Sequence, residues 1–397
     1  MPVYKQKPEF LTAALQSVLN QEWNQFRLVI VIDGAPEMEP QIRAIVGTDP
    51  RVELLHHEHN KGVAATLNTG FARLYEDHDI EYLTWVSSDN IYGPRFLDVL
   101  RQALVEGPEE LGLVYSCFEP MDNDNKHLYS ELDLSALRQF QGQPKDALLD
   151  SSIVAVSFMY KSRYAQLTRG YDLIPVEDYD YWLQLTDHCE IKFIPTELME
   201  YRVDSTFSVS AQLKSVEKQR HWRYTYHLAR HQARTRRHIA PEITILFPVS
   251  VGDQNAINRI ENLYNQSFSN YVCYVLDLSP TKQGIEVLSQ VPHPLTDFQH
   301  HPNVDIASAV KIAASQVTTP YTMWIGPNDF PTVVDLQMLY DNLCKQDPSV
   351  WSNYFAPVDF GINYRWQLMT ERPDWVNELF RTPHLIQYLN YKTIENE

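Results

Sequence analysis

The sequence predicts an α/β protein made of two copies of one unit, each with a mixed, mainly parallel sheet flanked by helices. Three observations support this prediction. Apolar segments of strand length alternate with segments of helical periodicity, acidic residues follow two of the strands, and similar segments begin at Pro2 and at Pro248. The 397 residues are also long for a single domain, so two domains are expected.

The first third of the chain alternates helices and strands. Residues 8–21 place apolar side chains at helical spacing, and residues 26–34 read as a buried strand that ends in a turn. A weaker strand follows at 52–58, then a helix over 60–75 and a strand over 80–90. This order is typical of a parallel sheet covered by helices.

Asp33 and Asp89 each end one of these predicted strands. Ligands of such sheets bind beyond the carboxyl ends of the strands, so the two acids are expected on one rim. The alternative for Asp89 is structural, because an aspartate in this turn can also cap the helix expected over 94–104.

The segment that begins at Pro248 repeats the pattern of the segment that begins at Pro2. Each has Pro-Val, a helix-length segment, Asn-Gln, two spaced aromatic residues and then an apolar strand. Without a gap, Asn328 stands opposite Asp89, and no adjacent Glu-Asp pair occurs after Pro331. We therefore predict a catalytic domain over 1–238 and a second, non-catalytic copy over 239–397, whose truncation stays open.

Residues 214–238 are rich in Arg, Lys and His within an acidic protein and read as a helix that closes the first unit. One interpretation is a solvated helix face. The other is a basic strip that lies against anionic lipid or a phosphate-bearing acceptor.

The composition excludes several classes of function. A formal net charge of -18 argues against nucleic acid as a partner, because phosphate binding needs a basic face. The four cysteines are widely spaced, as expected for reduced thiols rather than a disulfide framework or a zinc site. No apolar run approaches the roughly 18 residues that a bilayer span needs. We expect a cytoplasmic protein, with at most peripheral membrane contact through residues 214–238.

Taken in order, these motifs resemble those of the family 2 glycosyltransferases with the GT-A fold. The resemblance covers residues 1–210 and rests on the segments MPVYKQ, LVIVIDG, HNKGVAATLNTGF, WVSSDN, PVEDYDYWLQL and YRVDS. It implies an inverting enzyme that moves a sugar from a nucleotide-diphosphate donor, a UDP-sugar first among them. The implied acceptor is a hydroxyl of a growing polysaccharide, a lipid-linked glycan or a protein.

The resemblance also implies a divalent cation, Mg²⁺ or Mn²⁺, which would neutralise the charge that gathers on the leaving diphosphate. Asp89 matches the last acid of the family's Asp-x-Asp motif, and Ser87 stands where the first acid usually is. Asp204 replaces a histidine that often follows Tyr-Arg and would supply a second oxygen ligand.

By the same resemblance, Asp33 matches the acid that faces the base of the nucleotide, although Ile32 replaces the first member of the usual acidic pair. The remaining nucleotide-binding positions would be Pro2, Val3, Tyr4, Lys61, Ser87 and Ser88. Two of these have equally good alternatives, because Tyr4 could be a core aromatic and Lys61 a solvated loop lysine.

Glu177 and Asp178 match the family's Glu-Asp pair before an aromatic-rich helix, where the aspartate acts as general base on the acceptor hydroxyl. Tyr181 and Trp182 would then lie on the acceptor side. The alternative is an acidic first helical turn, which the helix dipole favours.

The beginning of the sequence departs from the family pattern. Family members have an apolar strand before Pro-Val-Tyr, and the second copy has one as EITILF, whereas the first copy begins at Met1. A fragment, a start at an internal methionine, or substitution by another segment would each explain this. The competing function is a catalytically inactive module that binds a sugar nucleotide or a glycan. A Rossmann dehydrogenase is set aside, because no glycine fingerprint follows the first strand.

Overall fold

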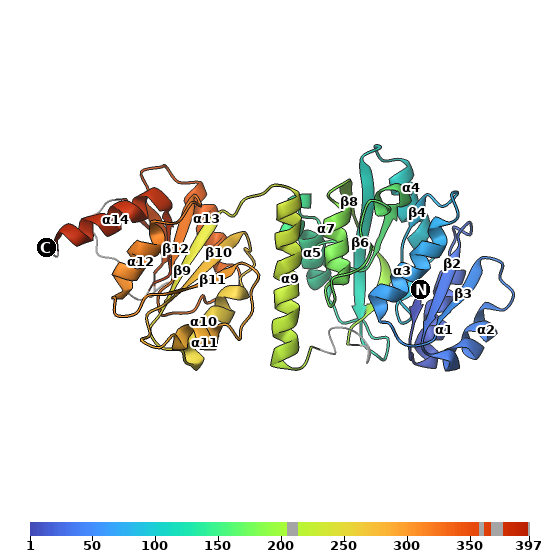
Figure 1. The fold of residues 1–397 in the computed structure, drawn as a ribbon. Helices are drawn as coiled ribbons and strands as arrows, with labels where there is room; N and C mark the ends of the chain where they lie inside the picture. Colours follow the sequence, from blue (N-terminus) through green and yellow to red (C-terminus); the bar gives the residue numbers. More distant parts are fainter. Residues whose placement is uncertain (205–212, 357–360, 367–375, 396–397) are drawn as a thin grey trace. The chain divides into compact units, whose positions relative to one another are not determined.

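The computed structural model describes residues 1–204, 213–356, 361–366 and 376–395 (Figure 1). The chain divides into two compact units, Met1–Ala229 and Arg230–Glu397, and each is described by itself. The division lies inside the helix α9 (Val216–Arg236), and the boundary predicted after residue 238 lies just beyond the end of that helix.

Unit 1 begins with a parallel three-stranded sheet in the order β1-β2-β3. Every residue of β2 is buried, which explains its continuous apolar sequence, and the apolar face of α1 packs into the same core. The alternation of strands and helices predicted for this region is therefore observed. The elements are β1 (Pro2–Val3), α1 (Pro8–Leu19), β2 (Leu28–Asp33), η1 (Pro36–Met38), α2 (Glu39–Val46), β3 (Val52–His57) and α3 (Val63–Tyr75).

The rest of unit 1 forms a second sheet of five strands in the order β4-β7-β6-β8-β5. Only the β6–β8 pair is parallel, so this half is more mixed than the predicted, mainly parallel sheet. Its strands are β4 (Tyr82–Leu83), β5 (Ile91–Tyr92), β6 (Leu111–Met121), β7 (Phe158–Lys161) and β8 (Glu190–Arg202). Its helices are α4 (Phe96–Val105), α5 (Glu131–Gln141), η2 (Lys145–Leu149), α6 (Ser162–Ala165) and α7 (Glu177–Leu185).

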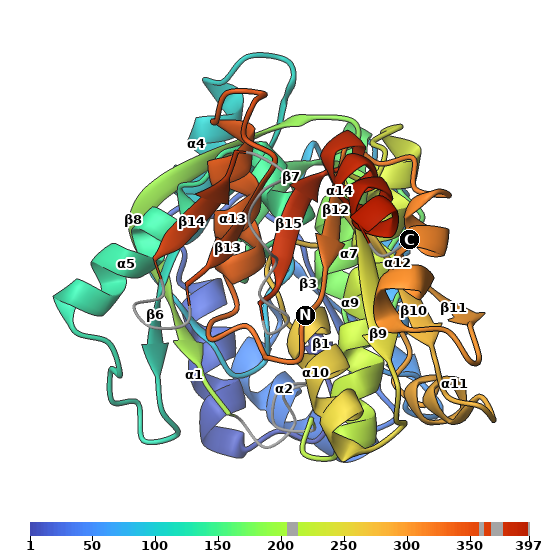
Figure 2. The same ribbon diagram turned by 90° about the vertical axis from the view of Figure 1, so that its left-hand side faces the viewer.

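Unit 2 is built on one sheet of seven strands in the order β11-β10-β9-β12-β15-β13-β14 (Figure 2). The first four strands are parallel to one another, and the last three join in antiparallel pairs. The strands are β9 (Ile243–Val249), β10 (Tyr271–Asp277), β11 (Thr296–His300), β12 (Tyr321–Trp324), β13 (Ser352–Phe355), β14 (Ile362–Arg365) and β15 (Glu378–Arg381). The helices are α10 (Gln254–Tyr264), α11 (Gln283–Leu288), α12 (Ile306–Ala314), α13 (Asp335–Cys344) and α14 (Thr382–Glu395).

Two glutamines make the same connection in the two units. Gln21 follows α1; its Nε2 donates to the carbonyl of Gly93 over 2.7 Å, and its Oε1 accepts from the amide of Leu97 over 3.0 Å. Gln266 follows α10 and makes the matching bonds, 2.9 Å to the carbonyl of Thr332 and 3.0 Å from the amide of Leu336. Each glutamine thereby satisfies a first-turn amide of a later helix, α4 or α13.

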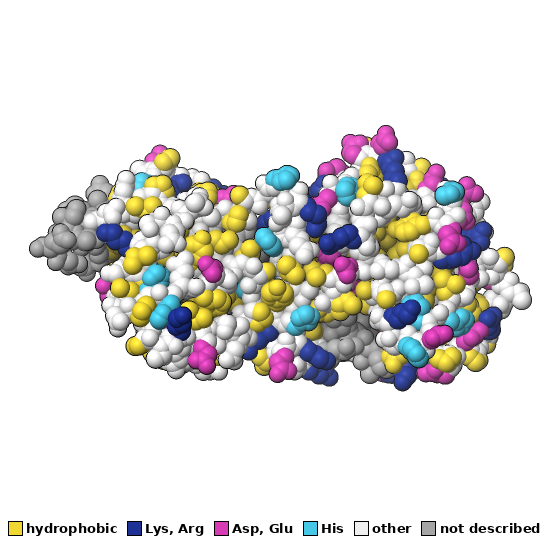
Figure 3. All heavy atoms as spheres, in the orientation of Figure 1, with side chains coloured by type: hydrophobic (Ala, Val, Ile, Leu, Met, Phe, Trp, Pro, Cys, Tyr) yellow, Lys and Arg dark blue, Asp and Glu magenta, His cyan; other side chains and the backbone are white. Residues whose placement is uncertain are grey.

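The surface of unit 1 carries acidic and basic side chains interspersed over the face shown in Figure 3. Within the basic segment 214–238, Arg234 is buried and donates from Nη1 to Ser269 Oγ over 2.9 Å, so this side chain is not on a solvated face.

None of the helices within the described residues combines the length and the hydropathy that a membrane crossing requires.

Candidate functional site

The carboxylate of Asp33 holds the loop between β3 and α3 against the end of β2. Its Oδ1 accepts from the amide of Lys61 over 2.9 Å and lies 2.7 Å from His57 Nδ1, and its Oδ2 accepts from the amide of Gly62 over 3.0 Å. The backbone passes very close here, since a Cβ at Gly34 would lie 2.3 Å from the same loop. Asp33 is 3% exposed, so the loop conformation depends on it.

The segment after β4 holds Asp89 in a turn that does not cap a helix. Asp89 Oδ1 accepts a short hydrogen bond from Ser87 Oγ, and the amide of Ser87 donates to the Tyr92 hydroxyl over 2.7 Å. The N-cap of α4 is Arg95, without a side-chain cap, and Gln21 supplies the acceptor for that helix. The capping alternative for Asp89 therefore does not apply, and its Oδ2 has no hydrogen-bond partner from the described residues.

Arg202, at the end of β8, holds this turn in place through a hydrogen bond to its backbone. This residue was not singled out in the sequence. Its Nε donates to the carbonyl of Asp89 over 3.1 Å, its Nη1 to that of Asp122 over 2.7 Å, and its Nη2 to Asn125 Oδ1 over 2.6 Å. The residue is 1% exposed. The available signal was the Tyr-Arg dipeptide two residues before Asp204, which places an arginine beside a predicted metal ligand.

Asp178 and Glu177 open α7 and carry perturbed carboxyl groups. Burial, and then the charge of Glu177, raise the pKa of Asp178 to about 8. Burial also raises the pKa of Glu177. Asp178 Oδ1 and Glu177 Oε2 are buried and have no hydrogen-bond partner within the described residues. An acidic first turn placed for the helix dipole alone would leave these oxygens in water, so the dipole does not account for them.

The phenol of Tyr201 is affected by three of the predicted acids. Burial is the main reason that its pKa is raised, and the charges of Asp89, Asp178 and Asp204 each raise it further. A carboxylate charge disfavours the ionised phenol and so raises its pKa. Asp89 comes from the turn after β4, Asp178 from α7 and Asp204 from the turn after β8, so acids from three separate segments act on the pKa of one phenol.

Tyr181 and Trp182 lie in the core rather than on an open surface. Their exposed fractions are 1% and 0%. Tyr181 stacks on Tyr171 with ring centres 4.1 Å apart, and Trp182 meets the edge of Phe158 at 4.3 Å. These contacts leave no face for an acceptor, and instead they fix α7 and with it the position of Asp178.

The other predicted nucleotide-binding residues lie in or directly after β1, in the loop between β3 and α3, and in the segment between β4 and β5. Val3 is fully buried, Pro2 and Tyr4 are half-buried, and the side chain of Lys61 is exposed. Ser88 accepts from Gln6 Nε2 over 3.3 Å. Tyr4 packs against the hydrophobic core, so the core interpretation of this aromatic side chain has direct support.

The donor set fits a cation that takes most of its ligands from a substrate. Within the described residues, no three His, Cys, Asp or Glu side chains group closely enough to hold a metal ion alone. Asp89 and Asp204 offer carboxylate oxygens, which Mg²⁺ and Mn²⁺ prefer, and the phosphates of a nucleotide donor would complete the shell. Asp204 is exposed and lies in a left-handed turn at φ 54°.

Part of the chain matches a known family. Residues 1–166 match the family model described as Glycosyl transferase family 2. An uncharacterized glycosyltransferase of Methanocaldococcus jannaschii is 24% identical over 221 residues, which cover 54% of this chain and 73% of that protein. One of Rickettsia bellii is 23% identical over 217 residues, 52% of this chain but only 29% of the relative. One of Haemophilus influenzae is 32% identical over 91 residues, 23% of this chain and 34% of that protein.

Solved structures show a distant similarity. Staphylococcus aureus TarS 1–349 in complex with UDP is 15% identical, with a TM-score of 0.42 over 57% of this chain and 63% of that one. The mannosyltransferase PcManGT of Pyrobaculum calidifontis, in complex with GDP-Man and Mn²⁺, is 14% identical, with a TM-score of 0.41 over 60% of this chain and 62% of that one.

The match to the family model lies within unit 1 and covers less than half of the chain. The matched residues contain Asp33 and Asp89 and end before Asp178. The general-base assignment therefore depends on the geometry of this chain.

Proposed function

We propose that unit 1 is an inverting, metal-dependent glycosyltransferase that moves a sugar from a nucleotide diphosphate to an acceptor hydroxyl. The observation that supports the proposal is that the charges of Asp89, Asp178 and Asp204 all raise the pKa of the same half-buried phenol, Tyr201. It supports a cation end and a base end of one site, which is what sugar transfer from a diphosphate requires.

Asp178 is the proposed general base. As the acceptor oxygen attacks the anomeric carbon, its proton passes to the carboxylate of Asp178. The new C–O bond forms on the face opposite the leaving group, the bond to the phosphate oxygen breaks, and the diphosphate leaves with the electron pair. The configuration at the anomeric carbon is therefore inverted. A base with a pKa of about 8 binds this proton more strongly than an ordinary carboxylate does.

Asp89 and Asp204 are the proposed protein ligands of a Mg²⁺ or Mn²⁺ ion, which when bound would neutralise charge on the diphosphate. Arg202 and Ser87 hold Asp89 in place for this task. Asp33 contributes to the donor pocket mainly through the loop that it holds at Lys61 and Gly62, because its three close contacts already occupy most of its carboxylate. We place a UDP-sugar first among the donors and a glycan, lipid-linked or protein hydroxyl as the acceptor.

Unit 2 is the proposed non-catalytic copy. The matching bonds of Gln21 and Gln266 support the gap-free alignment that places Asn328 opposite Asp89. The side chain of Asn377 fills this region of unit 2, where its Oδ1 accepts from the amide of Gly326 over 2.9 Å and its Nδ2 donates to the carbonyl of Asn328 over 3.1 Å. Asn328 itself offers a cation no charge, and the neighbouring Asp329 would serve as a ligand only through a one-residue shift of the alignment.

The test is turnover of labelled sugar nucleotides with Mn²⁺ by the wild type, Asp178→Asn and the control Asp172→Asn, an exposed aspartate before α7. We expect Asp178→Asn to lower kcat by about 100-fold or more, with donor binding retained in a thermal-shift assay. Asp172→Asn should behave as the wild type. Activity of Asp178→Asn within a few-fold of the wild type would contradict the assignment of the base.

One observation favours the alternative of an inactive binding module. A carboxyl group with a pKa of about 8 is mostly protonated at neutral pH, and a protonated acid cannot accept a proton. Donor binding by the wild type without turnover at any pH up to 9 would establish the binding module instead.

A further inference from the structure

Asn68, on α3, holds the backbone of Tyr171 through both groups of its side-chain amide. Its Nδ2 donates to the carbonyl of Tyr171 over 2.7 Å, and its Oδ1 accepts from the amide of Tyr171 over 2.9 Å. Gly170 lies so close that a Cβ there would meet Asn68 Oδ1 at 2.6 Å, and its φ of 82° favours glycine. The two segments, 103 residues apart in the sequence, therefore meet at one defined place.

The residues around Gly170 are also held from α7, by the side chain of Gln184. Its Oε1 accepts from the amide of Arg169 over 2.9 Å, and its Nε2 donates to the carbonyl of Gly170 over 3.3 Å. Gln184 is 5% exposed. Residues 169–171 thus form a linking segment between α3 and α7, because one amide side chain of each helix binds its backbone.

The ring of Tyr171 joins the same two helices. It stacks on Phe71 of α3 with ring centres 5.8 Å apart, and on Tyr181 of α7 with ring centres 4.1 Å apart. The ring planes lie 10° and 7° apart in these pairs. Tyr181 lies about one helical turn after Asp178, so the two side chains are neighbours on α7. Contacts to Tyr171 therefore bear on the part of α7 that carries the proposed base.

α3 is also bound to the loop that precedes it, which the proposed function places at the donor pocket. Thr69, next to Asn68, has its Oγ1 2.9 Å from His57 Nε2. His57 Nδ1 lies 2.7 Å from Asp33 Oδ1, and the carboxylate of Asp33 accepts from two amides of this loop. Adjacent residues of one helix therefore contact the donor side and the base side of the site.

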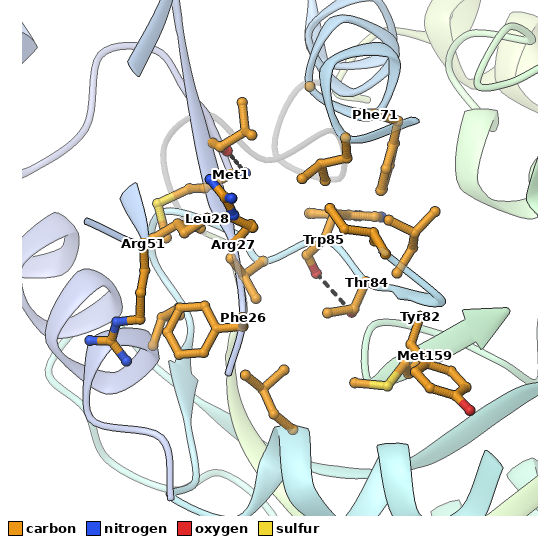
Figure 4. Close-up of a pocket in the computed structure, with 18 of the residues that line it drawn as sticks. Met1, Phe26, Arg27, Leu28, Arg51, Phe71, Tyr82, Thr84, Trp85 and Met159 are labelled. Atoms are coloured by element: carbon orange, nitrogen blue, oxygen red, sulfur yellow. Dashed lines mark hydrogen bonds between the residues drawn. The ribbon is translucent and has the colours of Figure 1, made fainter. Parts of the chain in front are cut away.

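Part of α3 borders a cavity of about 600 Å³ in unit 1, and Figure 4 shows Phe71 and Trp85 at this cavity. Leu67 and Gly70 of α3 also line it. Side chains that border a void lose packing contacts on that side. The placement of α3 therefore depends more on its directed contacts with the loop and with the linking segment.

We propose that Asn68 is a positioning residue for the general base, because through the linking segment it fixes α7, and with it Asp178, relative to the donor loop. The inference rests on the proposed function, in which Asp178 is that base. Asn68 acts through Tyr171 and Tyr181 rather than on a reactant. Proton transfer and attack require a precise arrangement of base, acceptor and donor, so a small displacement of α7 lowers kcat more than it weakens donor binding.

The test compares Asn68→Ala with Leu67→Ala in the full chain, with the labelled sugar nucleotide that the wild type turns over fastest. Leu67 is a buried residue of the same helix, and its truncation removes apolar packing but not the hydrogen bonds to Tyr171. We expect Asn68→Ala to lower kcat by about tenfold or more while the donor KM changes by less than about twofold. The midpoint of its pH profile for kcat/KM should fall by about half a unit or more, because water reaches Asp178 more easily.

Leu67→Ala should lower the Tm at least as much as Asn68→Ala does, with kcat and the midpoint of the wild type. If the two variants have the same kcat and the same midpoint, Asn68 has only a structural role and the proposal is wrong. If Asn68→Ala does not fold, Asn68→Asp takes its place in each comparison, because it keeps the acceptor for the amide of Tyr171.

Gln184→Ala releases the linking segment from the other helix. Asn68→Ala and Gln184→Ala together should lower kcat by clearly less than the product of their separate effects, because each releases the same segment. Fully multiplicative effects would show that the two side chains act independently and would contradict the proposal.

Hydrogen exchange separates a failure of this proposal from a failure of the proposed function. Asn68→Ala should speed exchange at the amides of α7 more than Leu67→Ala does. Faster exchange in α7, without turnover of any labelled sugar nucleotide by the wild type, would refute the proposed function and with it the assignment of a base. Unchanged exchange in α7, with normal turnover by the wild type, would overturn this proposal alone.

Discussion

The turn after β4 in unit 1 and the turn after β12 in unit 2 have the same frame but different chemistry. In both, a buried glutamine from the preceding repeat segment receives the amide at the start of the next helix. Unit 1 then holds a carboxylate, Asp89, with a serine and a buried arginine, whereas unit 2 has Asn328 and the side chain of Asn377. The backbone frame is thus separable from the charge that would hold a cation.

The first strands of the two units differ in length. The first strand of unit 2, β9, has seven residues, whereas β1 of unit 1 has two. The contrast between the two turns can be tested one residue at a time.

The largest effect is expected from exchanging the acid and the amide between the two turns. Asp89→Asn gives unit 1 the side chain found in unit 2, and we expect kcat for sugar transfer to fall by about 100-fold or more, because several kcal/mol of charge stabilisation depend on the cation. The Mn²⁺ concentration for half-maximal activity should also rise.

Asn328→Asp is the matched control for this exchange and should leave both quantities unchanged. If Asp89→Asn keeps the activity and the Mn²⁺ dependence of the wild type, the contrast between the two turns has no functional meaning.

A smaller effect concerns the pH dependence of Asp178. Its pKa is about 8, so below pH 8 the ionised fraction of the base rises about tenfold for each unit by which the pH increases. The value of kcat/KM should therefore rise with pH and level off above about pH 8. Rates measured from pH 6 to 9, with Asp172→Asn as the control, check this expectation. A flat profile would remove Asp178 from the rate-determining proton transfer.

Stability gives a second measurement of the same group. Because the folded pKa lies above the usual value of 3.8, the contribution of Asp178 to stability is present below about pH 4 and is lost as the pH rises through about 8. Asp178→Asn should therefore gain in Tm relative to the wild type as the pH rises from 4 to 8. A difference in Tm that does not change with pH would show that the carboxyl group is not perturbed in this way.

Much of the first sheet could be predicted from the sequence because its signals are local. The buried strand β2 is a continuous apolar run, and α1 has helical spacing, so neither depends on distant residues. β4 and β5 have two residues each and are defined only by their partners β7 and β8. Such short strands cannot be bounded from local sequence.

The candidate site shows a similar limit. The acids were predicted from their order along the chain, whereas Arg202 acts through contacts to residues 77 to 113 positions away. The burial of Tyr181 and Trp182 was also missed. α7 carries four polar residues, Glu177, Asp178, Asp180 and Gln184, which favour an exposed face, yet nearly the whole helix is buried.

The smallest expected effect tests the frame that the two units share. Gln21→Ala and Gln266→Ala each leave a buried amide, that of Leu97 or Leu336, and a carbonyl without their side-chain partners, which costs about 1–3 kcal/mol. Calorimetry should show a loss of about 2–10 °C in the Tm of the unit that carries the change. Gln143→Ala and Gln290→Ala remove exposed glutamines, one in each unit, and should change little. If only one of the two buried glutamines matters, the turns resemble each other in sequence but do not share a supporting structure, and the comparison of Asp89 with Asn328 loses its basis.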